Sequence, residues 1–174
     1  MKISMHTMAV DSFVPMLESL SAVLDKGAAH AEDKKLDLVN ARLAPDMYTL
    51  AQQVQIACDH AKDSVSRLMG KEPPHVENNE KTIDDLKIRI AKTVDQLKSA
   101  DATAFEGSED RDCSIPIPND MVIVMNGLEF LCAWALPHFY FHVVTAYDIL
   151  RHNGVAIGKQ DYLSQVGGFI RQRT

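Results

Sequence analysis

The stretch Phe130-Leu-Cys-Ala-Trp-Ala-Leu-Pro-His-Phe-Tyr-Phe-His-Val-Val-Thr-Ala-Tyr147 decides the fold of this chain. It carries no formal charge, and the helix predicted over residues 134–152 is apolar nearly all round, which is typical of a central buried helix. The run is just long enough to cross a membrane. However, Pro137, two histidines and other polar residues interrupt it, and no other segment comes close. We therefore expect a buried core helix and no membrane span.

Three more segments show apolar residues at spacings of three and four, the period of an amphipathic helix. They cover about residues 12–30, 45–69 and 82–100. In the first, Pro15 is expected to lie in the opening turn, where a missing N–H is tolerated. In the third, Thr82 opens a capping-box pattern in which an acidic residue three positions later completes the motif.

Between the third and fourth helices the pattern changes to that of strands. Residues 113–117 alternate, residues 121–125 are β-branched and apolar, and Pro118-Asn-Asp120 between them is a turn sequence. This predicts a short β-hairpin. We therefore predict an all-α fold, a four-helix bundle with a β-hairpin inserted before the last helix, forming a single domain over residues 1–174.

The composition limits the function. The formal net charge of −6 argues against nonspecific nucleic-acid binding, which needs a basic surface. The three cysteines show no paired spacing, which favours a reducing cytoplasm, and no signal-peptide pattern is visible at the start of the chain. The chain shows none of the common nucleotide-binding or hydrolase motifs. We expect a cytoplasmic protein without nucleic-acid or membrane partners.

The strongest chemical signal is the pair His138 and His142. Positions four apart in a helix lie on one face, so both imidazoles can hold one metal ion. A catalytic metal site needs about three protein ligands and an open position. His60 is the leading third ligand, because it lies on the border of the apolar stripe of the second helix, as does Gln53. The alternative is that these histidines are hydrogen-bonded core residues.

Two aromatic residues of the last helix, Trp134 and Tyr140, are candidates to line a pocket beside the histidines, together with Gln53. The competing interpretation is that they are ordinary core residues, since aromatic side chains on a buried helix usually are. Asp59, beside His60, is expected to face solvent.

Two segments also resemble a known family. Residues 136–163 and the stretch Gln53-Val-Gln-Ile-Ala-Cys-Asp-His-Ala-Lys62 are similar to the last and second helices of a bacterial family of domains of unknown function, and the likeness extends over nearly the whole chain. That family is grouped with the DinB/YfiT-like superfamily of metalloenzymes.

The resemblance implies a four-helix bundle, often a homodimer. Metal-binding members of the superfamily use one histidine of the second helix and an HxxxH pair of the last, which correspond here to His60, His138 and His142. Characterised relatives are transferases and isomerases that act with a low-molecular-weight thiol. This chain departs from the pattern in one respect, because the residues around its HxxxH pair are unusually apolar.

Two functional hypotheses follow. In the first, one divalent ion, zinc or nickel, lies on the three histidines, and the protein is a hydrolase or a thiol-dependent transferase. In the second, the protein is a metal-free, non-catalytic dimeric bundle that binds a small molecule or a protein partner. The sequence identifies neither the substrate nor the role of the tail, residues 155–174.

Overall fold

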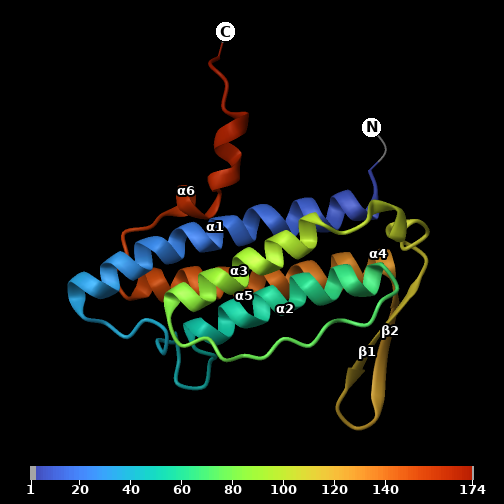
Figure 1. Cartoon of the computed structure of the whole chain (residues 1–174), viewed down its shortest axis with the longest axis horizontal. Coiled ribbons are helices and arrows are strands. Elements are labelled where there is room, and N and C mark those ends of the chain that lie inside the picture. The colour runs from blue at the N-terminus through green and yellow to red at the C-terminus, as the bar shows by residue number, and fades with distance from the viewer. Residues whose placement is uncertain (1–2, 174) are drawn as a thin grey trace.

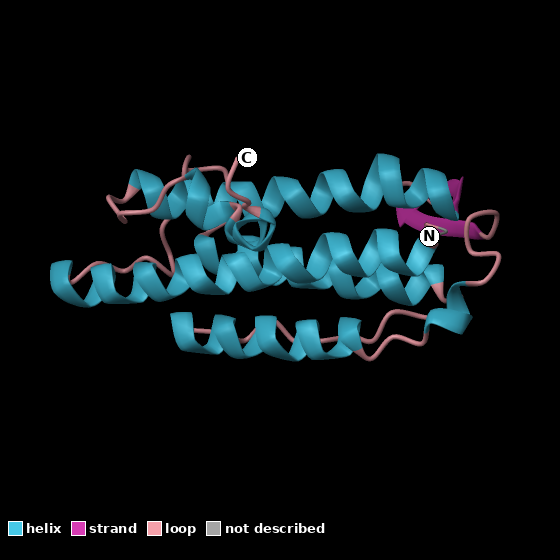
Figure 2. Ribbon diagram, turned by 90° about the horizontal axis from the view of Figure 1, so that it is seen from above, coloured by secondary structure: helices cyan, strands magenta, loops and turns pink. Residues whose placement is uncertain are grey.

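Four long helices form the body of the protein (Figures 1 and 2). They are α1 (Met5–Lys34), α2 (Leu50–Leu68), α3 (Ile83–Lys98) and α5 (Leu136–His152) in a computed structural model that describes residues 3–173. Helix α2 packs against α3 and α5, and α1 packs against the same two helices. This is the predicted four-helix bundle.

The core lies between these helices and consists mainly of aliphatic side chains. Its aromatic centre is the pair Phe13 and Phe139, both fully buried, whose ring centroids are 4.8 Å apart in an edge-to-face arrangement. Helix α1 is long and apolar enough to cross a membrane, but 56% of its most apolar window is buried inside the bundle. In this structure it packs as a core helix of the bundle.

The first helix begins earlier than predicted. Ser4 lies in the extended region, and its side chain accepts a hydrogen bond from the backbone N–H of Thr7, so the helix starts at Met5. Pro15 consequently lies inside the helix and not in its first turn. Met5, Ala9 and Val10 continue the buried face of the helix, so the apolar period extends to these added turns and the predicted start at residue 12 was too late.

The starts of α2 and α3 are both set by capping boxes. Thr49 and Gln52 form one before α2. Pro45 therefore lies in the preceding loop, whereas the sequence predicted that the helix begins there. Thr82 and Asp85 form the other, as the sequence predicted. Each box satisfies backbone N–H groups that the first helical turn leaves without partners.

The predicted hairpin is confirmed as β1 (Asp112–Ile117) paired antiparallel with β2 (Met121–Asn126). It projects from one end of the bundle (Figure 1). The chain then enters the last helix through α4 (Gly127–Glu129) and the π-helical segment η2 (Phe130–Ala135). Within this segment the N–H of Leu136 donates to the carbonyl of Leu131, five residues back.

The last helix is less enclosed than its composition predicted. Phe139 and Val143 are buried, whereas Phe141 is 57% exposed and Val144 is 39% exposed. Because only one side of α5 meets α1 and α2, the other side stays at the surface despite its apolar residues.

The tail continues as α6 (Lys159–Tyr162) and the 3-10 segment η3 (Ser164–Phe169). It crosses α1, where the hydroxyls of Ser19 and Ser164 are 2.6 Å apart, and its last part points away from the bundle (Figure 1).

Gly127 is required by a close backbone approach. A Cβ atom at this position would lie 1.8 Å from the carbonyl oxygen of Ser108. We expect Gly127→Ala to destabilise the protein by about 1–3 kcal/mol, because the backbone must shift to relieve the overlap. Chemical denaturation measures the change. Gly168→Ala is the matched control, since nothing lies within 4 Å of its added Cβ. Equal stability of both variants would contradict this packing.

Candidate functional site

The three predicted histidines come together between α2 and α5. The ring centroids of His60 and His138 are 5.0 Å apart, and those of His60 and His142 are 5.6 Å apart. The π-helical segment directly before α5 sets the angle at which the HxxxH face enters the bundle. Segments of this kind are frequent at functional sites.

These spacings suit a shared metal ion. A metal–nitrogen bond of about 2 Å places each ring centroid about 3 Å from the ion, so tetrahedral imidazole ligands have centroids about 5 Å apart. The rings are nevertheless not turned toward one common point, since those of His60 and His142 are nearly parallel, at 16°. Accordingly, among residues 3–173 no group of three or more His, Cys, Asp or Glu is already arranged to hold a metal.

The protonation state of the site favours metal binding over ion pairing. Burial, together with the neighbouring imidazoles His138 and His142, lowers the pKa of His60 to about 4. Burial, with His138 beside it, lowers the pKa of His142 to about 4 as well. Both rings are therefore neutral near pH 7, and a neutral imidazole is the form that binds a metal.

Gln53 orients His142. Its Nε2 donates to the backbone carbonyl of Tyr48 at 3.3 Å, so its Oε1 faces the histidine and accepts from Nδ1 of His142 at 2.7 Å. Because an amide oxygen only accepts, the proton of His142 lies on Nδ1 and its Nε2 carries a free lone pair. Hydrogen bonds of this type commonly fix metal-ligating histidines.

The two predicted aromatic neighbours have different positions. Trp134 packs against His138, with ring centroids 4.2 Å apart. Gln53, Trp134 and Tyr140 were predicted to line the histidine pocket, but none of them is among its lining residues. Tyr140 lies two residues after His138 and is thus turned about 200° around the helix. Burial raises its pKa, which a hydrogen bond with Ser12 of α1 partly offsets.

An open cavity of about 580 Å³ adjoins the histidines. Beside the three rings, its walls are formed by Tyr48 from the loop before α2, Ile56 from α2, and Pro137 and Phe141 from α5. None of these side chains carries a formal charge. Tyr48 and Phe141 were not predicted as site residues, because nothing in the sequence indicated which side of α5 stays uncovered.

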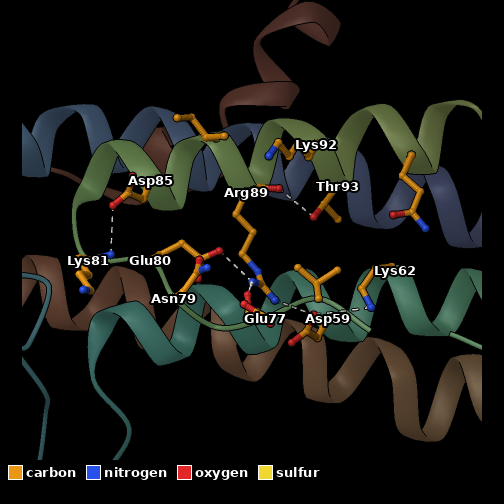
Figure 3. A pocket seen from close by; sticks show the side chains of 13 residues that line it. Asp59, Lys62, Glu77, Asn79, Glu80, Lys81, Asp85, Arg89, Lys92 and Thr93 are labelled. Carbon is orange, nitrogen blue, oxygen red and sulfur yellow. Dashed lines mark hydrogen bonds and ion pairs between the residues drawn. The ribbon is translucent and has the colours of Figure 1, made fainter. Parts of the chain in front are cut away.

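A second cavity, of about 800 Å³, lies between α2, α3 and the loop that connects them (Figure 3). Its centre is Arg89, which is 5% exposed. Arg89 donates to Asp59 at 2.8 Å and to Glu80 at 2.9 Å, and also to the backbone carbonyl of Glu77. Lys62 is likewise buried and donates to the carbonyl of Pro74. These contacts fasten the loop to both helices.

This network corrects the expectation that Asp59 faces solvent. Its carboxylate is partly buried against Arg89, and burial raises its pKa above the usual value although Arg89 and Lys62 oppose this. Burial alone would also raise the pKa of Glu80, but hydrogen bonds from Arg89 and Gln55 outweigh it and hold that pKa below its usual value. The sequence showed only a charged helix face, which gives no sign of a buried arginine.

The comparisons with known proteins agree with this fold. Residues 5–163 match the family model described as Domain of unknown function (DUF1993). The chain belongs to this family. It is also 42% identical to a DinB family member protein from Shewanella denitrificans, whose crystal structure superposes with a TM-score of 0.83. The match covers 91% of this chain and 90% of that chain. No curated protein shows significant similarity.

The buried ion pairs yield a stability prediction. We expect Arg89→Met to lower the free energy of unfolding by about 3–5 kcal/mol at pH 7, because it leaves Glu80 buried without its cation and leaves Asp59 with only Lys62, 3.7 Å away. Lys92→Met is the control, since Lys92 lines the same cavity but is exposed. Urea denaturation measures both variants.

The same measurement over a range of pH tests the mechanism. In the wild type, the lowered pKa of Glu80 stabilises the fold above its ordinary pKa of 4.5, and this contribution is lost as the pH falls through the folded value. In Arg89→Met, protonation instead relieves the unpaired carboxylates. The difference in free energy of unfolding between the wild type and Arg89→Met should therefore become smaller below about pH 4.5. A difference in unfolding free energy that does not change with pH would contradict the role given to Arg89.

Proposed function

We propose that this DinB-like protein binds one divalent metal ion, zinc or nickel, through His60, His138 and His142. The observation that carries the proposal is the meeting of three imidazoles from two helices, with ring centroids 5.0 Å apart for His60 and His138 and 5.6 Å apart for His60 and His142. Metal binding would require the rings to rotate about their side-chain bonds until one nitrogen of each faces the ion. The apolar surroundings would hold such an ion away from competing charged groups.

The proposed reaction class is hydrolysis or transfer of a thiol. A bound ion of this kind supplies Lewis acidity and lowers the pKa of a water or thiol at its open position. The protein contributes the remaining parts. Gln53 holds the Nδ1 proton of His142, Trp134 packs on the ring of His138, and the adjoining cavity admits a small molecule.

Metal content decides between this proposal and the metal-free bundle. We expect about one equivalent of zinc or nickel in the purified protein, or after incubation with either ion, and its loss in His138→Ala. Elemental analysis after gel filtration gives the measurement, and His75→Ala, in the exposed loop before α3, is the control. Absence of metal from the refilled wild type would instead support a bundle that binds a small molecule or partner without a metal.

Gln53 offers a finer test of the same site. We expect Gln53→Met to weaken metal affinity by about 10–100-fold, because it removes the acceptor that orients His142. Gln53→Glu keeps an oxygen acceptor and should retain most of the affinity. Competition with a chelating dye measures both variants. If the two lose affinity equally, the hydrogen bond to His142 does not orient a ligand.

We also propose that the protein forms a homodimer in the cytoplasm, with β2 as a contact surface. Residues 121–125 of β2 carry no charge, and Met121, Val122 and Val124 are more than half exposed. An uncharged strand edge without proline pairs readily with a second copy, whereas Pro116 obstructs the outer edge of β1. The free cysteines Cys58, Cys113 and Cys132 are compatible with a reducing compartment.

A charge placed on this edge should weaken the dimer. We expect Val124→Lys to shift the protein toward the monomer in sedimentation velocity experiments, since a lysine on an edge strand disfavours pairing with a second strand. Ile88→Lys is the control, because Ile88 is 54% exposed on α3, away from the hairpin. A dimer that tolerates Val124→Lys would place the contact elsewhere, and a monomeric wild type would contradict the dimer.

A further inference from the structure

The cavity around Arg89 and the cavity at the histidines differ sharply in charge. The cavity around Arg89 is lined mainly by charged side chains, including Lys62, Lys81 and Lys92 as well as acidic residues. The cavity at the histidines has no charged lining residue. A charged ligand therefore finds counter-ions in the first cavity but not in the second.

The histidine cavity instead offers apolar surface at its mouth. Tyr48 is 53% exposed and Phe141 is 57% exposed, and both line the cavity with Ile56 and Pro137. The ring of Phe141 lies edge-on to that of His142, with centroids 5.3 Å apart. An aromatic surface therefore begins directly beside the proposed ligands. Exposed aromatic side chains gathered at a concave site are typical of ligand binding.

Charge complementarity excludes most ionic ligands from this site. A carboxylate packed between Tyr48 and Phe141, away from the proposed metal ion, would lose water and meet only uncharged side chains, which costs free energy without a compensating partner. A cation would meet aromatic faces, which attract it, but it would also lie beside the proposed metal ion, which repels it. A neutral apolar group incurs neither cost.

We infer that the molecule bound at the histidine site is an uncharged one with an aromatic or comparably bulky apolar group, which packs between Tyr48 and Phe141 while its donor atom faces the histidines. The cavity volume of about 580 Å³ accommodates a substituted ring of this kind. This inference rests on the proposed function for the position of the donor atom. The apolar subsite itself is formed by the protein side chains alone.

Three thiols of different charge test the inference. Phenylmethanethiol is neutral and aromatic, 3-mercaptopropionate is anionic and thiocholine is cationic. Isothermal titration of the zinc-loaded protein should give the tightest binding for phenylmethanethiol. Phe141→Ala and Tyr48→Ala should each weaken it about tenfold, the typical effect of losing an aromatic contact. Tyr48→Phe keeps the ring and should bind normally, and so should Ile88→Ala, an exposed apolar residue of α3.

A second measurement separates this inference from the metal proposal. Saturation-transfer NMR on metal-free protein should show contact with the ring of phenylmethanethiol, and Phe141→Ala should abolish it. Zinc titration reports independently on the three histidines. Failure of zinc to bind, with the ring signal retained, would overturn the metal proposal and leave the apolar subsite. Tighter binding of 3-mercaptopropionate or thiocholine, or no effect of Phe141→Ala, would overturn the inference.

Discussion

The packing of α2 against α5 is the constraint on which the rest of this structure depends. Three half-buried imidazoles lie along this contact, and polar rings partly removed from water are unfavourable unless they gain partners. Gln53 supplies a partner for one nitrogen of His142, and the neighbouring rings supply mutual contacts. Ring nitrogens that have no hydrogen-bond partner in the described part of the chain could each bind a metal ion, which would supply the missing partner.

Helix α2 faces two polar environments of opposite character. Toward α5 it presents the neutral groups Gln53 and His60, and toward α3 it presents Asp59 and Lys62, which join the network of Arg89. Adjacent residues of one helix point in directions about 100° apart, so a single turn supplies both faces. The charged groups on the α3 side are paired with one another and hold the loop between α2 and α3. The uncharged groups on the α5 side border an apolar cavity that is open to solvent.

The position of the HxxxH face depends on irregular chain geometry just before α5. The hairpin returns the chain to the bundle, Gly127 allows its backbone to pass Ser108, and the π-helical segment changes the helical register before Pro137. The π-helical segment itself adds Phe130, Leu131 and Ala135 to the core, and its geometry bears on which residues of α5 meet α2. The same path leaves Phe141 at the surface beside the cavity, where a ligand can reach it.

The sequence by itself determined the four helices, the hairpin and the capping box at Thr82, because these follow from periodicity and spacing along the chain. That His60 lies near the HxxxH pair was indicated only by its place on the border of an apolar stripe and by the family resemblance. The sequence could not indicate that Ser4 starts α1, that Arg89 is buried against Asp59, or that Tyr140 turns toward α1. Only the tertiary structure decided these features. Burial and pairing depend on which helix faces meet, and that is settled by packing between segments far apart in the sequence.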